Sequence, residues 1–244
     1  MMLATIHEYA TEKLQQSGEA EKFKKLHAAY FLGLAEEAEP KIEGPDQVSW
    51  MGSLEAEQDN FRAALSSSLE AGDLETLLRI GGALWWFWAS RGHFSEGRGW
   101  LEAGLTGGEG IPVRVRAKAL LVLGDLSLGQ SDYGRAVESV EASLGLSRET
   151  GDKRGEAHSL FTLGWMALER DEFERAAGLL EESLALSRAS GTSIDVRRAL
   201  NGLAVLNLDR GDYARASALW DECLRLPGKP ATSEASASTR TTSR

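Results

Sequence analysis

The stretch LFTLGWMALERDEFERAAGLLEESLALSRASGT (residues 160–192) decides the fold, because similar stretches stand 40 residues before it and 40 residues after it. The earlier copy, LLVLGDLSLGQSDYGRAVESVEASLGLSRETGD, begins at Leu120, and the later one, LNGLAVLNLDRGDYARASALWDECLRL, begins at Leu200. Aligned positions carry the same kind of side chain: Leu123, Leu163 and Leu203; Gly124, Gly164 and Ala204; Ala136, Ala176 and Ala216; Leu144, Leu184 and Leu224. A fixed period of about 30 to 45 residues with two helical patterns per unit predicts an all-α solenoid.

Each copy predicts a helix, a tight turn and a second helix. The small residue at Gly124 and its equivalents lets a neighbouring helix backbone approach closely. Asp132 and Asp212 precede the second helices of their copies, where a short acidic side chain caps free N–H groups. Because the loops are short, we expect the two helices of a copy to be antiparallel. A helix-ending glycine is joined to a capping residue at Gly72–Asp73, Gly151–Asp152 and Gly191–Thr192.

This pattern resembles the tetratricopeptide repeat, and LGWMALERDEFERAAGLLEESLAL and LNLDRGDYARASALWDECLRL carry the resemblance well. The resemblance covers residues 116–226 and implies a right-handed superhelical solenoid of tetratricopeptide-like helix hairpins. The period departs from the usual ~34 residues by about six, which long-helix variants of the repeat accommodate. The motif is specific for the fold and says little about function.

The stretch ALWWFWASRGHFSEG (83–97) places three tryptophans and a phenylalanine at four consecutive positions. The segment that begins at Arg91 aligns with the one that begins at Gln130, so the tryptophans fall in the first helix of an earlier, degenerate unit. Trp85 and Trp88 lie three residues apart on one helical face, and we interpret the cluster as core packing. The alternative is that Trp86, which points elsewhere, is exposed and serves a partner domain.

Residues 1–72 also predict helices. The first has apolar residues at helical spacing and stops at Gly18, and the second runs to Pro40. A third begins at Pro45, a residue favoured in the first turn, and ends at Gly72. The apolar positions of the first helix are Leu3, Ile6, Ala10 and Leu14.

Three phrases in order, LATIHEYATEKLQQSGEAEKFKKLHAAYFLGLAEEAEP, WMGSLEAEQDNFRAAL and ALWWFWASRGHFSEGRGWLEAGL, resemble bacterial regulators of the signal-transducing NTPase class. In that class an NB-ARC-type ATPase is followed by a winged-helix segment and by tetratricopeptide repeats, and many members carry a LuxR-type or SARP-type DNA-binding domain. The resemblance implies that this chain is the sensor part. It divides the chain into a helical segment resembling the end of a winged-helix region (1–40), a helical region with a degenerate unit (41–115), three repeats (116–226) and a disordered tail (227–244).

The sequence carries no motif for catalysis, a cofactor or a metal. It lacks the G-x-x-x-x-G-K-[ST] phosphate loop, and no two of its four histidines have the spacing of a zinc-binding helix. Cys223 fills the position of Ser143 and Ser183, has no assignable base, and is predicted to be a buried packing residue. The net charge of −10 disfavours a nucleic-acid surface, and no stretch approaches about 18 apolar residues. We expect a non-enzymatic protein that by itself binds neither nucleic acid nor membrane; the single cysteine fits a cytoplasmic location.

The last 18 residues, PGKPATSEASASTRTTSR (227–244), are rich in Ser, Thr and Ala and cannot bury a core. The last repeat then ends without the polar cap that solenoids normally need, and we expect an exposed apolar edge around Leu219, Trp220 and Leu224. Two explanations stay open: the reading frame is truncated, which we favour, or self-association covers the edge.

In tetratricopeptide solenoids the first helices of successive units line a concave groove. The repeat period places nine residues there: Lys118, Leu121, Asp125, His158, Phe161, Trp165, Arg198, Asn201 and Val205. Six of them are binding candidates: Lys118, His158, Phe161, Trp165, Arg198 and Asn201. Phe161 and Trp165 are apolar anchors, and the resemblance to long-helix relatives implies that the Asn201 amide, both donor and acceptor, holds a ligand backbone. The alternative is that these are solvated helix positions.

The sequence therefore predicts a protein–protein interaction or sensor module of a bacterial transcriptional regulator, without ATPase or DNA-binding domains in these 244 residues. Its partner would be a protein, a peptide or another domain of an intact regulator. One alternative is a free-standing adaptor that competes for the regulator's partner. Another is a fragment of an ATP-dependent signalling ATPase that has lost its N-terminal part.

Overall fold

The computed structural model describes residues 13, 16–44, 46–107, 110–190 and 193–226. All regular secondary structure in these residues is helical, in twelve helices. They are α2 (Ala20–Ala38), α3 (Gln47–Ala56), α4 (Gln58–Glu70), α5 (Leu74–Ala83), α6 (Trp85–Arg91), α7 (Phe94–Thr106), α8 (Val113–Gly129), α9 (Tyr133–Thr150), α10 (Lys153–Glu169), α11 (Phe173–Ser190), α12 (Ser193–Asp209) and α13 (Tyr213–Arg225).

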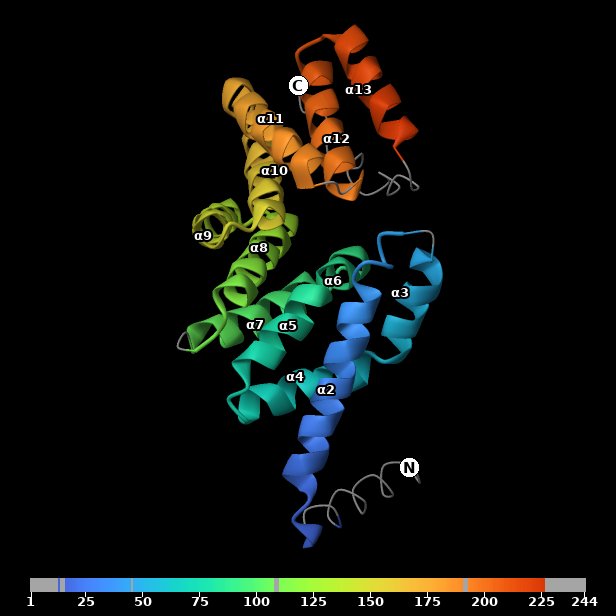
Figure 1. The fold of residues 1–244 in the computed structure, drawn as a ribbon, viewed down its shortest axis with the longest axis vertical. Coiled ribbons are helices and arrows are strands. Elements are labelled where there is room, and N and C mark those ends of the chain that lie inside the picture. Colours follow the sequence, from blue (N-terminus) through green and yellow to red (C-terminus); the bar gives the residue numbers. More distant parts are fainter. Residues whose placement is uncertain (1–12, 14–15, 45, 108–109, 191–192, 227–244) are drawn as a thin grey trace.

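The helices pair along the chain into stacked hairpins, which confirms the all-α solenoid of tetratricopeptide-like hairpins (Figure 1). The three hairpins α8–α9, α10–α11 and α12–α13 extend from a bundle formed by α2–α7. In each hairpin the first helix packs against the second helix, and α10 also packs against the first helices α8 and α12. The first helices are therefore the more buried of each pair.

The small-residue position explains how closely each pair packs. A Cβ atom on Gly124 would stand 2.3 Å from a methyl carbon of Val140 and 3.2 Å from the Ala136 carbonyl oxygen. At Gly164 it would stand 2.8 Å from Leu180. Since real Cβ atoms do not approach neighbours this closely, these two crossings favour glycine, in agreement with the small residue that the sequence predicts at this position.

The turns are closed by the aspartates expected from the sequence. Asp132 accepts a hydrogen bond from the Arg135 N–H at 3.3 Å, and Asp212 accepts one from the Arg215 N–H at 3.0 Å. Gly151 ends α9 with φ +66°, a left-handed conformation that suits glycine. Asp73 and Asp152 cap α5 and α10 in the same way. The Gly191–Thr192 pair lies outside the described residues.

A second repeated contact joins the two helices of each hairpin. The Ser143 hydroxyl donates to the Ala117 carbonyl oxygen at 2.8 Å, and 40 positions later the Ser183 hydroxyl donates to the Ala157 carbonyl oxygen at 2.7 Å. Cys223 stands at the third equivalent position, 3.9 Å from the Arg197 carbonyl oxygen, and is 8% exposed. The prediction of a buried packing cysteine is confirmed.

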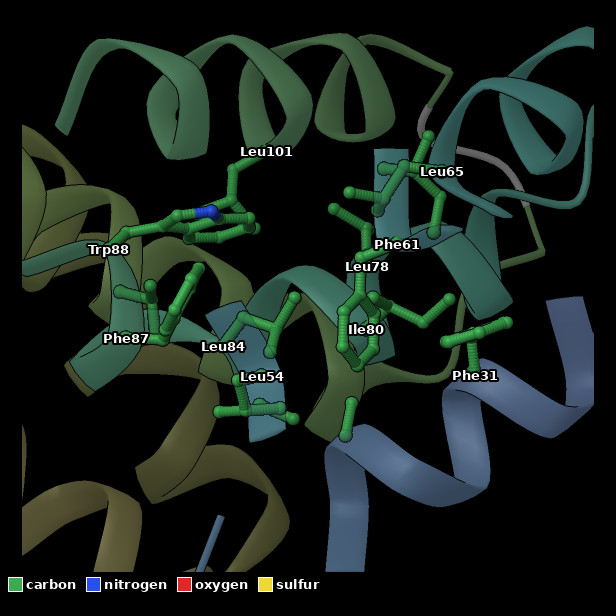
Figure 2. Packing of buried hydrophobic residues seen from close by; sticks show 14 of the residues in the cluster. Phe31, Leu54, Phe61, Leu65, Leu78, Ile80, Leu84, Phe87, Trp88 and Leu101 are labelled. Atoms are coloured by element: carbon green, nitrogen blue, oxygen red, sulfur yellow. The ribbon is translucent and has the colours of Figure 1, made fainter. Parts of the chain in front are cut away.

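The N-terminal bundle is built on large apolar side chains (Figure 2). Trp88 lies against Leu101 of α7, and Phe87 and Leu84 fill the space toward α3. Phe31 of α2 packs edge-on against Phe61 of α4, with ring centroids 5.1 Å apart. Several separate helices thus share one core, which a repeat pattern alone does not reveal.

Two expected helices are broken. The single helix predicted between Pro45 and Gly72 is interrupted at Glu57, whose ψ of 7° separates α3 from α4. The first helix of the degenerate unit is interrupted at Leu84, with ψ 6°. The buried Leu54 precedes the first bend, and the buried Leu84 is itself the second bend. Each bend directs both halves of its helix toward the shared core. The helix predicted before Gly18 lies almost wholly outside the described residues.

The tryptophan cluster is core packing, as the sequence indicates. Phe87 and Trp88 are each 2% exposed. Trp85 and Trp86 are half-buried, in contact with each other at a ring-centroid distance of 5.1 Å and packed against the same core. Trp86 is not exposed as the alternative expected, because it packs against this core and its indole nitrogen is buried.

The C-terminal edge differs in part from the prediction. Leu219 is 5% exposed, because it packs against α12, and Trp220 is half-buried. Only Leu224, at 67% exposed, fits the expected apolar edge, and Tyr213 at the start of the same helix is 69% exposed. The predicted disordered tail, 227–244, lies outside the described residues.

Candidate interaction surface on the first helices

The six predicted binding residues lie on the first helices of the three hairpins, α8, α10 and α12, and all are half-buried. We call the surface formed by Lys118, His158, Phe161, Trp165, Arg198 and Asn201 the first-helix face. Lys118, His158 and Arg198 occupy the same repeat position, and Phe161 and Asn201 share another. Because α10 packs against both α8 and α12, the repeat brings three basic or ionisable side chains into one row.

Leu121 does not belong to this surface, although the repeat period places it there. It is 5% exposed and packs with Val140, Leu163 and Met166 between the first two hairpins. Leu121 turns into the seam between the hairpins. The larger Phe161, at the equivalent position of α10, remains half-buried.

At one end of the row, Lys118 forms an ion pair with Glu39, with 2.6 Å between Nζ and the carboxylate oxygen. Its aliphatic stem runs along α5 beside Gly82, where a Cβ atom would meet three of its carbons at 3.4 Å. The stem is thereby held by packing while the ammonium group faces the carboxylate.

His158 stands in the middle of the row. Its Nε2 lies 3.4 Å from an Asp125 carboxylate oxygen, and the other oxygen of Asp125 accepts a hydrogen bond from the Thr162 hydroxyl at 2.9 Å. The imidazole ring also meets the Trp85 ring edge-on at 6.0 Å. His158 is therefore held by two groups, Asp125 of α8 and Trp85 of α6.

Arg198 stands at the far end. It pairs with Glu43 at 2.6 Å and with Asp195, one turn earlier on α12, at 3.4 Å. Its guanidinium carbon lies 5.4 Å from the centre of the Trp85 ring, a distance typical of a cation–π contact. The Arg198 and Glu43 side chains are only 21% and 14% exposed, so this pair is shielded from solvent.

The aromatic candidates form a separate part of the surface. Phe161 and Trp165 lie on neighbouring turns of α10, with ring centroids 6.1 Å apart. The Trp165 indole N–H donates a hydrogen bond to Glu169 at 2.9 Å. The Asn201 side-chain oxygen accepts a hydrogen bond from the Trp220 indole N–H at 3.0 Å. This contact joins α12 to α13, so the acceptor expected to hold a ligand backbone already has a donor within the chain.

Three residues of the surface were missed by reasoning from the repeat: Trp85, Glu39 and Glu43. Trp85 was assigned to the core, although it contacts His158 and Arg198 on the other side. The glutamates follow α2 and belong to no repeat position. No periodic signal could have paired them with residues 79 and 155 positions away.

Two observations on the described residues concern metal binding and the reactivity of the single cysteine. No group of three His, Cys, Asp or Glu side chains among them is placed to hold a metal ion. Burial raises the pKa of the Cys223 thiol, which works against formation of the thiolate. In the part of the chain that the structure covers, no helix is long and apolar enough to cross a bilayer.

A separate hollow of about 500 Å³ lies between α2 and α4, away from the first-helix face. Phe23 and His27 line it from α2, and Ala63 and Ser67 line it from α4. The ion pair between Lys24 and Glu70, 3.4 Å apart, spans the two helices at its rim.

Residues 115–189 match the tetratricopeptide repeat family. The fold is shared with solved solenoids of low sequence identity. A kinesin light chain of Podospora anserina with tetratricopeptide-like repeats has a TM-score of 0.58 at 14% identity, covering 81% of this chain and 94% of that one. The MamA protein has a TM-score of 0.52 at 13% identity, covering 81% of this chain and 90% of that one.

Sequence similarity also extends to bacterial proteins from Mycobacterium bovis and Mycobacterium tuberculosis, which carry the name "Putative HTH-type transcriptional regulator". Each is 31% identical to this chain over 159 residues, which are 62% of this chain and 18% of the relative. The match thus spans less than a fifth of the length of these relatives. The matched residues 115–189, which form the hairpins α8–α9 and α10–α11, are tetratricopeptide repeats, the protein-interaction module of helical solenoids.

Proposed function

We propose that the chain is the partner-binding sensor region of a bacterial transcriptional regulator, that it acts in the cytoplasm, and that it recognises a protein or peptide through the first-helix face. In this proposal the ATPase and DNA-reading functions of the NB-ARC class belong to other parts of the regulator. Residues 1–40 correspond to the end of a winged-helix region, 41–115 to a degenerate unit, and 116–226 to the repeats.

The observation that carries the proposal is the 31% identity over 159 residues to the mycobacterial proteins named as HTH-type regulators. The aligned length, 62% of this chain, exceeds what the 75 residues of the family match alone would contribute (189 − 115 + 1). The first-helix face supports the recognition part, since it combines half-buried aromatic side chains with charged ones. Such a mixture is typical of residues that dominate binding energy at protein interfaces.

The test is affinity capture followed by titration with each purified partner. We expect Trp165→Ala to weaken binding at least about tenfold, which corresponds to ~1.4 kcal/mol, because an aromatic anchor is lost. Asn201→Ala should weaken it less, because its oxygen is engaged by Trp220. Tyr213→Ala is the control, since Tyr213 is 69% exposed on the second helix of the last hairpin. If Trp165→Ala and Asn201→Ala both retain every partner at unchanged affinity, the assigned surface is wrong.

The regulatory part is tested separately by transcript profiling. Overproduction of the wild-type chain should change a defined set of transcripts by competing for the regulator's signal or partner. Trp165→Ala, at equal protein level, should not. Identical profiles for the wild type and an empty vector, in cells where a captured partner is present, would contradict a role in transcription.

A further inference from the structure

The connection between α2 and α3 reaches the first-helix face. We call residues 39–44, EPKIEG, the acidic connection. Ile42 is fully buried in the core of the N-terminal bundle, and its N–H donates to the Ala38 carbonyl oxygen at 2.9 Å. This anchor fixes the backbone, and the two glutamates on either side of it, Glu39 and Glu43, face the repeats.

Both glutamates bind cations at the same repeat position. Glu39 pairs with Lys118 of α8, and Glu43 pairs with Arg198 of α12, each at 2.6 Å. Lys118 and Arg198 are two repeat periods apart, with His158 between them on α10. The carboxylates of Glu39 and Glu43 thus lie where those of a bound acidic segment would contact Lys118 and Arg198.

The acidic connection reaches α12 across the packed seam between the first two hairpins. The core of the N-terminal bundle includes α8, the core of the last two hairpins includes α10, and between them Leu121 of α8 packs with Leu163 and Met166 of α10. The acidic connection meets α12 through the Glu43–Arg198 pair, and Arg198 also stacks on Trp85 of α6. The Lys118–Glu39 pair, with side chains 41% and 31% exposed, is weakened by salt, whereas the more buried Glu43–Arg198 pair is screened less and needs another carboxylate in place of Glu43.

We propose that the acidic connection is an internal ligand of the first-helix face, and that an acidic segment of a partner binds by displacing its carboxylates from Lys118 and Arg198. The proposal rests on the proposed function and specifies its partner chemistry. Carboxylates fit because the face holds two cations that already bind carboxylates. Trp85 beneath Arg198 keeps the guanidinium in position when Glu43 leaves.

The first experiment measures whether the two glutamates hold the last hairpin close to the N-terminal bundle. Nitroxide labels are placed at Val48 on α3 and Leu224 on α13, which are 86% and 67% exposed, in a Cys223→Ser background. Electron double resonance should give one narrow distance distribution for this protein. Glu39→Gln/Glu43→Gln should broaden it toward longer distances. Glu174→Gln is the matched control, because it removes a different Arg–Glu pair, with Arg210 at 2.9 Å. Superimposable distributions for the double variant and the control would overturn the proposal.

The second experiment measures competition. The probe is a fluorescein-labelled peptide with the sequence of residues 36–48, EEAEPKIEGPDQV, followed by anisotropy. It should bind Glu39→Gln/Glu43→Gln at least about tenfold more tightly than the wild type, because the tethered competitor has lost its charges. Adding Arg198→Gln should remove the gain, and so should glutamine in place of the two peptide residues that correspond to Glu39 and Glu43. Equal affinity for the wild type and the double variant would overturn the proposal.

The two proposals fail in different ways. If the double variant stays closed and gains no affinity while Trp165→Ala still weakens a purified partner, the internal-ligand proposal is wrong and the proposed function stands. If the double variant opens and gains affinity while Trp165→Ala costs no partner affinity, the acidic site is supported and the aromatic part of the assigned surface is wrong.

Discussion

The N-terminal bundle, α2–α7, and the repeat hairpins, α8–α13, solve the same packing problem in two ways. In the hairpins, small groups at fixed positions do the work: a glycine at the crossing, an aspartate at the turn and a serine hydroxyl on a carbonyl oxygen. In the bundle, Trp88, Phe87 and Phe61 fill one shared core and the helices bend around it (Figure 2). Because their contacts repeat, the hairpins can be extended by further units of the same kind, whereas the N-terminal bundle depends on a few large side chains.

The largest expected effect is therefore in the bundle. Trp88→Ala should lower the free energy of unfolding by ~3–5 kcal/mol, since a side chain that is 2% exposed leaves a cavity beside Leu101. Trp165→Ala on the half-buried surface of α10 should cost far less. Urea unfolding followed by far-ultraviolet circular dichroism measures both. Equal losses for the two variants would erase the distinction between the regions.

The next effect is in the hairpins and has the opposite cause, overpacking. Gly124→Ala should cost ~1–3 kcal/mol, because the added carbon would stand 2.3 Å from Val140. Val140→Ala in the same chain should recover part of this loss. Gly134→Ala is the control, since a Cβ there meets nothing within 4 Å and should stabilise α9 by ~0.5–1 kcal/mol. A neutral Gly124→Ala would show that the crossing does not need glycine.

Charge at the turn between the first two hairpins gives a smaller, pH-dependent effect. The hydrogen bond from Lys153, at 2.9 Å, and that from Arg148, at 3.0 Å, hold the pKa of Glu156 below its ordinary value against the opposing effect of burial. Because the folded-state pKa is the lower one, the stabilisation is present at neutral pH and is lost as the pH falls through it. Glu156→Gln should cost ~0.5–1 kcal/mol at neutral pH and nothing in acid. The measurement is the free energy of unfolding of the wild type and of Glu156→Gln at neutral and at acidic pH. A difference between the two proteins that stays the same at every pH would contradict this interpretation.

The smallest effect tests whether the last hairpin is equivalent to the other two. Cys223→Ser should change stability by less than ~0.5 kcal/mol, because the hydroxyl gains the hydrogen bond to Arg197 that Ser143 and Ser183 make to their own carbonyls. Calorimetry of the two proteins at equal concentration is the measurement. A loss above ~1.5 kcal/mol would mean that this hydroxyl finds no acceptor, and that the third hairpin is built differently.

The features that the sequence predicts are those that recur. Gly124 and Gly164 stand one period apart, and the capping Asp132 and Asp212 stand two periods apart, so comparison of the copies reveals them. The bends at Glu57 and Leu84 are not predictable in this way, because tertiary packing in a single shared core imposes them on segments with good helical patterns. Leu121 shows a finer limit: the period gives its position, but the local seam between hairpins decides its burial.

The contact between Glu43 and Arg198 also orders the assembly of the molecule in time. The two residues are 155 positions apart, and a ribosome adding ~5–20 residues per second needs about 8–30 s to proceed from one to the other. Neighbouring hairpins collapse as each emerges, since their contacts are local in the chain. We therefore expect the bridge to α12 to form after the hairpins that it joins, and its loss to leave the earlier folding steps of the nascent chain unchanged.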